Sequence, residues 1–561
     1  MYTVQKLLSS PLSKRFRRMA LLNVAIVLFL CFLLSLTTPV WNSLGLAHLP
    51  KSTAKAAAPL VRRINIPYFN NAAVPFNQTA IFWFGAVSSG DNSIDVRMGY
   101  NNSELYVDLH IIDRYLWYDP NAKSPNLSIG DTATIYLNTT QNGSNAPDQF
   151  SYKFVAQVDW YQPRTYYQQA YRGNGSTWVA SSAPFTSVSG WRGTGFNGNE
   201  DAGWTMTYHI PFSSLGKSVP SQGTPWKLGV RVHNQDNASD TPLSVKWWPE
   251  TASDTVPASW GALVFGFPTY QAPHTTNNTT YTIRNKLNGQ VVTDAMVGGS
   301  LNCFTHGLNR WTLFGGQSYP GADRINIQNE VDISDWDCFS RFYITFPLGS
   351  LPTGKGVVSA KVTLYEWGNP GPIGKPNPSL IQVASVNQDW NPATISWNNA
   401  PLIQENISRT VVNIMPGKIV YPGQPYTWDV SRALAAAYAA GQPLRLAFYS
   451  SDSAYSSGKY FFGSSLGDWN ANGRPALQAT LGTITSSPSV NATTSTSPTT
   501  KASAGRGQQI EVHQLVAGNT QAVMPGKENS HTFYFAPLFV LPAPLFFLGS
   551  ALRRRRGLRR R

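Results

Sequence analysis

The sequence has little charge, few cysteines and none of the short motifs that mark common catalytic sites. Lys, Arg, Asp and Glu make up only 13% of the 561 residues, and there are 3 Cys and 8 His. No Gly-x-Ser-x-Gly element, phosphate-binding loop, His-Glu-x-x-His pair or Cys-His cluster occurs. The acidic pairs Glu200/Asp201 and Asp335/Asp337 are adjacent or nearly so, which is typical of solvated or calcium-binding loops. The sequence therefore predicts no enzyme, no bound cofactor and no assigned metal site.

Positive charge is concentrated at the two ends of the chain. Residues 1–63 carry 9 Lys or Arg and no acid, and residues 553–561 carry 7 Arg, which leaves 28 basic and 29 acidic residues between them. A neutral middle has no electrostatic footprint for phosphates, so nucleic acid is excluded as a partner.

An apolar run lies beside the basic residues at each end. Residues 19–36 are uncharged and follow Lys14 to Arg18, as in an export signal that is either cleaved or retained as an anchor. Residues 533–552 form a second uncharged run that stops at Arg553. This end is either a membrane span or resembles the sorting tails of bacterial surface proteins, although it has no LPxTG motif. We expect the middle to lie outside the cytoplasmic membrane, anchored at the cell surface through its termini.

The cysteines fit an exported protein. Cys31 lies in the first apolar run, which leaves Cys303 and Cys338 as the pair in the middle of the chain. They form either a disulfide, which an oxidising compartment favours, or two buried thiols, since spacing does not report the distance between their Cα atoms.

The middle of the chain is predicted to be all-β. Residues 105–112, 132–137, 228–232 and 361–365 alternate apolar and polar side chains, and turns rich in Gly, Asn and Pro separate such segments. Only residues 431–440 have a helical composition. We expect two jelly-roll-like β-sandwiches with an N-terminal signal or anchor helix and a C-terminal apolar tail. The expected parts are a basic segment with signal or anchor (1–63), a first sandwich (64–268), a linker (269–280), a second sandwich (281–482), a Ser/Thr-rich stalk (483–532) and a membrane span or sorting tail (533–561).

The first domain is rich in Trp, and its strand segments end in polar residues. Residues 101–113, 130–137, 204–215, 228–236 and the Trp247-Trp248 pair follow one another in an order that resembles the family 9 carbohydrate-binding modules and the DOMON-like sandwiches. The resemblance implies a β-sandwich that binds a polysaccharide or oligosaccharide between aromatic side chains.

That resemblance assigns the candidate site. Trp248 and Trp247 match the aromatic position before the last strand, and Asn234 or Asp236 matches the polar position after the preceding one. Where family members carry another aromatic residue, this chain has Leu127 to Ile129, so Trp117 or Tyr118 is the candidate replacement. Neighbouring residues of a strand point to opposite faces, so one Trp of the 247/248 pair must leave the core.

The second domain carries a more specific pattern. Residues 342–365 are followed by a Trp-x6-Trp-Asn-Asn-Ala-Pro element from Trp390 to Pro401 and by residues 428–430, 461–465 and 474–477. This order is similar to the DNRLRE domain, also classed as family 96 of the carbohydrate-binding modules. The resemblance implies polysaccharide binding in some members, and a spacer or adhesive role in others.

Two other functions stay open on the sequence. The protein is an envelope or adhesion component that binds no small ligand, or it binds haem through Met98 and either His209 or His233, as some DOMON-like domains do. The strand pattern around Met98 favours a core residue over a haem ligand. The sequence does not indicate an oligomeric state.

Overall fold

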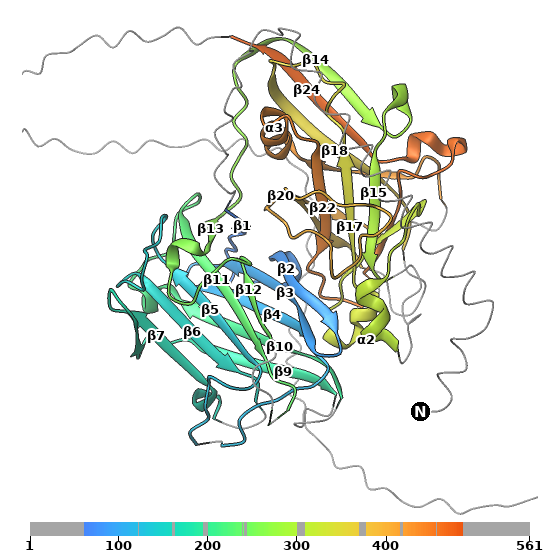
Figure 1. Ribbon diagram of the computed structural model, residues 1–561. Helices are drawn as coiled ribbons and strands as arrows, with labels where there is room; N and C mark the ends of the chain where they lie inside the picture. The colour runs from blue at the N-terminus through green and yellow to red at the C-terminus, as the bar shows by residue number, and fades with distance from the viewer. Residues whose placement is uncertain are drawn as a thin grey trace, which may run out of the picture. The chain divides into compact units, whose positions relative to one another are not determined.

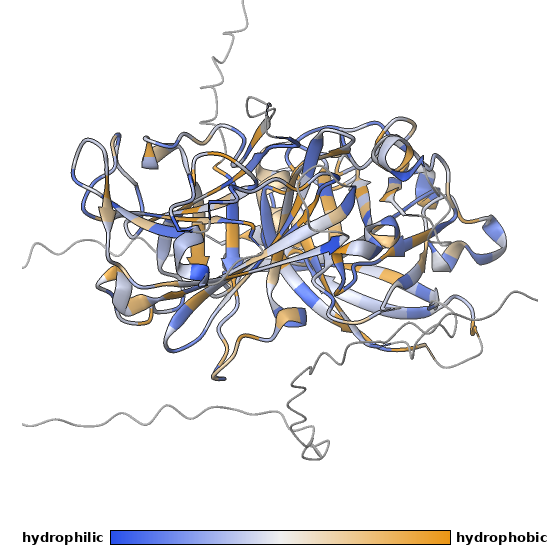
Figure 2. Cartoon of the chain, turned by 90° about the horizontal axis from the view of Figure 1, so that it is seen from below, coloured by the Kyte–Doolittle hydropathy of each residue, from blue (hydrophilic) through white to orange (hydrophobic). Residues whose placement is uncertain are grey.

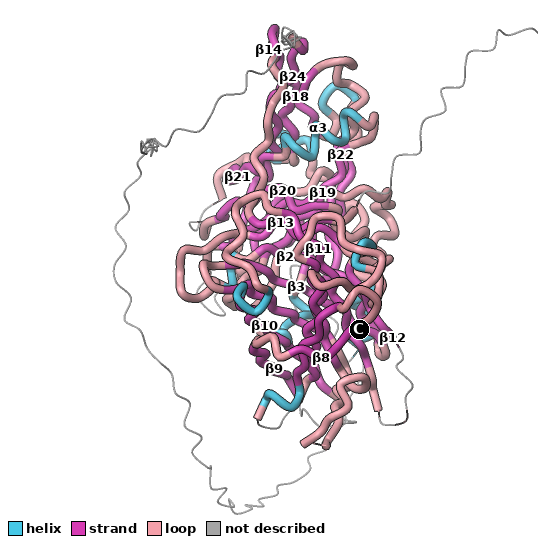
Figure 3. The backbone as a smooth tube through the Cα atoms, turned by 90° about the vertical axis from the view of Figure 1, so that its left-hand side faces the viewer, coloured by secondary structure: helices cyan, strands magenta, loops and turns pink. Residues whose placement is uncertain are grey.

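The computed structural model describes residues 61–485, apart from residues 122, 160–162, 194–199, 238, 240–243, 300–308, 370–376, 416–418 and 456. This part of the chain is almost entirely strand and loop (Figure 3), which confirms the all-β prediction. The two apolar runs and the Ser/Thr-rich segment after residue 485 lie outside the described residues. No helix within residues 61–485, gaps excepted, is long and apolar enough to cross a membrane.

The first sandwich consists of two sheets (Figure 1). One sheet has the order β2 (Ala80–Ser88), β3 (Asp91–Tyr100), β4 (Glu104–Ile112), β10 (Asp201–Pro211) and β9 (Thr186–Gly193). The other has the order β1 (Arg63–Ile66), β13 (Gly261–Phe265), β11 (Pro225–Asn234), β5 (Thr132–Asn138), β6 (Ser151–Gln157), β7 (Gln168–Gly173) and β8 (Trp178–Ser181), with β12 (Ser244–Trp248) paired to β11.

The second sandwich also has two sheets. The first of them has the order β15 (Thr293–Gly298), β17 (Ser340–Phe346), β22 (Leu444–Ser450), β19 (Ser379–Ser385) and β20 (Glu405–Val412). The other has the order β14 (Thr275–Arg284), β24 (Ala476–Ile484), β18 (Gly356–Gly368), β23 (Lys459–Phe462) and β16 (Arg324–Ile327), with β21 (Gln424–Asp429) paired to β18.

Helical elements in the described residues are short. The α-helices are α2 (Arg310–Leu313) and α3 (Ser431–Ala439). The 3-10 segments are η1 (Phe76–Gln78), η2 (Arg164–Tyr167), η3 (Phe212–Leu215), η4 (Pro257–Ser259), η5 (Leu287–Gly289), η7 (Phe314–Gly316), η8 (Ile333–Cys338) and η9 (Asp468–Gly473). Helix α3 coincides with the predicted one because its run of Ala, the strongest helix former, leaves little side-chain entropy to lose.

Alternation of side chains along the strands builds the core. In β10, Trp204, Met206, Tyr208 and Ile210 are fully buried, while the residues between them face outward. Figure 2 shows this alternation of hydrophobic and hydrophilic residues along many strands. Strand β14 is different, because its exposed side chains are Thr and Asn and only Ile283 is buried. It begins at Thr275, inside the predicted linker, since an exposed edge strand needs no apolar residues.

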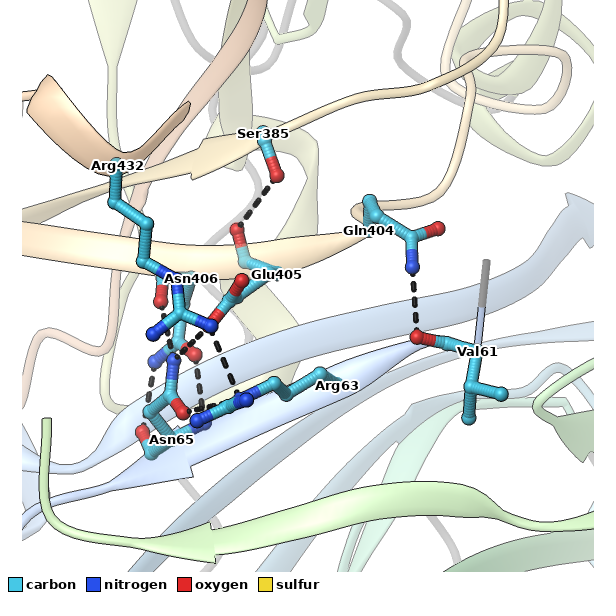
Figure 4. A network of polar contacts seen from close by, with 8 residues as sticks. All are labelled: Val61, Arg63, Asn65, Ser385, Gln404, Glu405, Asn406 and Arg432. Carbon is cyan, nitrogen blue, oxygen red and sulfur yellow. Dashed lines mark hydrogen bonds and ion pairs between the residues drawn. The ribbon is translucent and has the colours of Figure 1, made fainter. Parts of the chain in front are cut away.

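A short parallel strand joins the two sandwiches. Strand β1 pairs with β13 of the first sandwich and, at Arg63 and Glu405, with β20 of the second, so one sheet continues across the junction. Figure 4 shows the polar network around this pairing. The Asn65 backbone N–H donates to Asn406 Oδ1 at 2.7 Å, and Asn406 Nδ2 donates to the Asn65 carbonyl at 2.8 Å. Glu405 Oε1 lies 3.1 Å from Arg63 Nε and 3.2 Å from Arg432 Nη2.

A buried ion pair lies deeper in the same junction. Arg341 Nη2 of β17 donates to Asp95 Oδ1 of β3 at 2.6 Å, and both side chains are almost completely buried. The guanidinium carbon lies 3.5 Å from the ring centroid of Trp397 and 4.4 Å from that of Trp83. The hydrophobic cluster of the first sandwich continues around this pair into the second sandwich, which has a further core of its own.

The predicted disulfide is only partly within the described residues. Cys338, at the end of η8, is disulfide-bonded and buried. Its predicted partner Cys303 lies outside the described residues, so the pairing of these two residues stays a prediction.

Candidate functional site

The two tryptophans at the end of β12 point to opposite faces of the sheet. Trp248 is fully buried and packs on Phe82, with 4.4 Å between ring centroids. It is a core residue, and the expectation that it offers an exposed ring to a saccharide is wrong. Trp247 is half-buried on the outer face, where its ring lies 5.0 Å from Tyr136 and 5.8 Å from the Arg231 guanidinium carbon.

The other predicted site residues lie mostly inside the fold. Tyr118 belongs to the core, Asn234 is 1% exposed, and its Nδ2 donates to Asp236 Oδ1 at 3.1 Å. Trp117 is half-buried, and its backbone N–H donates to Asp131 Oδ2 at 2.7 Å. These residues therefore do not form an exposed aromatic platform with Trp247. The resemblance placed them by order along the chain, which does not determine which face a side chain takes.

The predicted haem pair is not assembled. Met98 is fully buried on β3 and shares a row with Val107 and Tyr208. His209 follows Tyr208 and so points to the opposite face of the sheet, where its Nδ1 lies 2.9 Å from Glu104 Oε1. His233 belongs to the other sheet, and its ring approaches the Gly130 carbonyl. Met98 is core packing, as its strand pattern favours.

Two buried carboxyl groups lie near Asp236. Burial raises the pKa of Asp113 to about 8, and the charge of Asp236 adds to this effect. Asp131 accepts hydrogen bonds from the Trp117 and Gln235 backbone N–H groups, so it organises two loops. Among the described residues, no group of three or more His, Cys, Asp or Glu is placed to hold a metal ion.

The outer face of the β11/β5/β6/β7 sheet is hollowed, with a cavity volume of about 540 Å³. We call this feature the sheet hollow. Its floor consists of side chains from paired strands, which share a face because cross-strand partners point the same way. Arg231 pairs with Thr134, Thr134 with Val155, and Val155 with Gln169. A second row pairs Tyr136 with Lys153 and Lys153 with Tyr171. Trp247 continues the first row beyond Arg231.

Basic side chains dominate the charge of the sheet hollow. Lys123, Lys153 and Arg231 line it, and no Asp or Glu is among its lining residues in the described part of the chain. Burial lowers the pKa of Lys153, and its ammonium group lies 3.0 Å from Asp254 Oδ1, outside the lining. Arg231 is partly buried, and its Nη1 donates to the Tyr136 hydroxyl at 3.5 Å. The lining of the sheet hollow therefore favours an anionic ligand over a cationic one.

The remaining lining residues are neutral and suited to hydroxyl groups. Gln168, Gln169, Thr132 and Thr134 are polar, although the Gln168 amide already donates to the Phe185 carbonyl and the Gln169 amide to the Ala170 and Ser181 carbonyls. Tyr166 contributes a ring that is 46% exposed. Burial lowers the pKa of His233, so its imidazole is neutral at pH 7. Its Nδ1 lies 2.9 Å from the Gly130 carbonyl, which places the ring proton there and leaves Nε2 as an acceptor.

Sequence reasoning missed the sheet hollow, although one signal for it was present. The alternate residues Thr132, Thr134 and Tyr136 are polar or aromatic, which predicts that they leave the core. That alternation does not determine which strands lie side by side or in which register they pair. The basic residues of the site come from separate segments that only the sheet pairing brings together.

A family model matches part of the second sandwich. Residues 315–470 match the model of carbohydrate-binding module family 96, which confirms the resemblance found in this part of the sequence. No curated protein sequence matches the chain.

Solved structures with similarity to the chain include two of a family 9 carbohydrate-binding module from Caldicellulosiruptor kristjanssonii. The complex with cellotriose is 11% identical, has a TM-score of 0.27, and the match covers 37% of this chain and 95% of the module. The complex with glucose is 11% identical, has a TM-score of 0.26, and the match covers 37% of this chain and 98% of the module. Family 9 is the group that the first domain's sequence resembles. At these TM-scores the structures carry no argument about the ligand of this chain.

Proposed function

We propose that this protein is a non-catalytic carbohydrate-binding protein of the bacterial cell surface, and that its first sandwich binds an acidic saccharide unit in the sheet hollow. The observation that carries the proposal is the sheet hollow itself. Its volume of about 540 Å³ lies within the usual range of ligand pockets, roughly 300 to 1,000 Å³. The family 96 match supports carbohydrate binding by the chain as a whole.

The chemistry of the lining fits a sugar that carries a carboxylate. A pyranose ring has apolar C–H faces that pack on an aromatic ring such as Tyr166, while its hydroxyls exchange hydrogen bonds with amides and Thr hydroxyls. The planar guanidinium of Arg231 suits a carboxylate, because two parallel N–H groups can donate to its two oxygens. Arg231 is the residue on which the preference for an acidic sugar depends.

Calorimetric titration of the full-length protein tests this proposal. We expect trigalacturonic acid to bind with micromolar to millimolar affinity, and cellotriose to bind more weakly at this site. Arg231→Gln should weaken binding of the acidic trisaccharide by about tenfold or more, since a charge-assisted hydrogen bond contributes about 1.5 to 3 kcal/mol. Added salt should weaken wild-type binding and affect the variant less.

Arg172→Gln is the matched control. Arg172 is an exposed residue of the same sheet, but it follows Tyr171 in β7 and therefore points to the opposite face. Its replacement should leave the titration unchanged. If neither saccharide binds, or if both substitutions have the same effect, the sheet hollow is not an acidic-sugar site and a structural role in the envelope is favoured.

The surface location is the second part of the proposal. It is supported by the basic residues and apolar run at each end of the chain and by the disulfide of Cys338, a bond typical of oxidising compartments. Protease added to intact cells should degrade the two sandwiches. An epitope after Arg553 should survive if the C-terminal run is a membrane span, and be absent from the mature protein if it is a sorting tail.

A further inference from the structure

Five aromatic side chains of the second sandwich form a continuous cluster that reaches the surface. Trp469 is 65% exposed and Tyr421 is 58% exposed. Their rings lie 5.1 Å apart at an angle of 88°, so together they form an open corner. Beneath them, Phe462 lies 6.4 Å from Tyr421 and 6.2 Å from Trp367, and Trp367 lies 5.4 Å from Tyr460. We call these five residues the aromatic platform.

The positions of the three rings beneath the corner follow from the geometry of strands β18 and β23. Tyr460 and Phe462 are two residues apart in β23, so they share its outer face, while Phe461 between them is fully buried. Trp367 lies at a register shift where β18 pairs with β23. Such a bulge turns a side chain out of the regular alternation. The Trp367 indole N–H donates to the Phe461 carbonyl at 3.0 Å, which fixes the direction of the ring.

Two loops place the exposed rings. Trp469 is the second residue of η9, and Tyr421 lies in the turn that leads into β21. Gly423 in this turn has a φ of +111°, and an added Cβ would lie 2.8 Å from the Glu366 carbonyl oxygen. A glycine is therefore required for the turn to fold back against β18 and bring Tyr421 over Phe462.

The exposure of the corner is not needed for folding. An aromatic side chain removes about 150 to 250 Å² from water when it is buried, and these two rings leave more than half of their surface in solvent. Val420 beside Tyr421 is 72% exposed. The two rings offer roughly 200 to 300 Å² to a ligand, whereas a stable protein interface needs about 800 Å² on each partner. A patch of this size suits one or two sugar rings.

The polar rim indicates which kind of sugar fits. Asp468 precedes Trp469, and its carboxylate accepts from Arg474 and from Lys286 Nζ at 3.1 Å. The hydrogen bonds from Arg474 and then Lys286 lower the pKa of Asp468, so it is ionised at neutral pH. An exposed carboxylate accepts hydrogen bonds from sugar hydroxyls. Lys286 and Arg474 are engaged by Asp468, and the Arg324 guanidinium carbon lies 4.8 Å from the centroid of the Trp367 ring.

We infer that the aromatic platform is a second saccharide site, which binds neutral pyranose rings of a polysaccharide by stacking in the corner between Tyr421 and Trp469. The site is separate from the sheet hollow, and stacking on its rings requires no charge on the sugar. One molecule with both sites would attach to two parts of a mixed polysaccharide, and the effective concentration of the second contact would strengthen weak binding.

Calorimetric titration of the full-length protein with cellohexaose, xylohexaose and mannohexaose tests the inference. We expect at least one of these neutral hexasaccharides to bind. Trp469→Ala and Tyr421→Ala should each weaken that binding by at least about tenfold, which corresponds to about 1.4 kcal/mol. Trp469→Phe keeps a ring in the corner and should retain most of the affinity. All three variants should keep the wild-type thermal midpoint, because exposed rings contribute little to the core.

Two control variants show whether the loss of binding is specific to the aromatic platform. Tyr455→Ala removes a ring that is 52% exposed but lies outside the aromatic platform, and it should have no effect. Arg231→Gln should weaken the acidic trisaccharide and leave the neutral hexasaccharides unchanged, so failure of the first site does not imply failure of the second. The inference is overturned if none of the three hexasaccharides binds, or if Trp469→Ala leaves their binding unchanged.

Discussion

Arg341 should be essential for the stability of the junction between the two sandwiches. Arg341 is 1% exposed, and its ion pair with Asp95 joins strands of different sandwiches at 2.6 Å. Arg341→Met keeps the length and apolar contacts of the side chain but removes its charge. Asp95 would then remain buried with only the Tyr449 hydroxyl at 2.6 Å and the Asn329 amide at 3.4 Å as partners.

The expected cost follows from this burial. Removing one partner of a buried ion pair costs about 3 to 5 kcal/mol of the free energy of unfolding, because the other charge is left uncompensated. The three aromatic rings around the guanidinium, with centroids at 3.5, 4.4 and 4.8 Å, add cation–π contacts that the Met side chain cannot replace. Asp95→Asn combined with Arg341→Met should cost less than the sum of the two single changes, since no charge is then left unpaired.

Guanidinium denaturation of the full-length protein, followed by tryptophan fluorescence, measures the effect. The control is Arg445→Met, which removes an ion pair between Arg445 and Asp389 at 3.2 Å. The Asp389 side chain is 84% exposed, so this change should cost about 1 kcal/mol or less. Limited proteolysis after Arg341→Met should also cut faster near residues 268–274, because a weakened junction opens more often. If Arg341→Met costs no more than the control, the buried pair does not hold the junction.

Stability should decrease as the pH rises from 5 to 9. Burial raises the pKa of Asp294 to about 7 and that of Glu366 to about 8, so both stay protonated in the folded state where the unfolded chain is ionised. Their contribution to the free energy of unfolding is complete below the pKa values that the two groups have in the unfolded chain. It is lost as the pH rises through their pKa values in the folded state. Thermal midpoints should therefore fall over this range, and fall less in Asp294→Asn; a rise would contradict the assignment. Trp248→Ala should cost about 3 to 5 kcal/mol and Trp247→Ala clearly less, since only the first ring is fully buried. Equal losses in a denaturant titration would contradict this difference.

Local sequence patterns were sufficient for the class of fold. The alternation in residues 105–112 and 132–137 corresponds to β4 and β5, and the Ala-rich stretch corresponds to α3. These features depend on side-chain period and on helix propensity, which are properties of neighbouring residues. The same reasoning required one ring of Trp247 and Trp248 to leave the core. It did not decide which one, because that depends on which face of β12 packs against the other sheet.

The candidate sites depend on residues that are far apart in the chain. The sheet hollow requires β11 to pair with β5 and β5 with β6, and the aromatic platform requires η9 and the turn before β21 to meet over β23. Asp95 and Arg341 are separated by 246 residues. A single sequence specifies the alternation within each strand, but the partner and register of a strand are decided by how all faces pack at once. The sequence by itself therefore determined an all-β chain in which one ring of the Trp247 and Trp248 pair leaves the core, whereas only the tertiary structure decided which side chains come together to form a site.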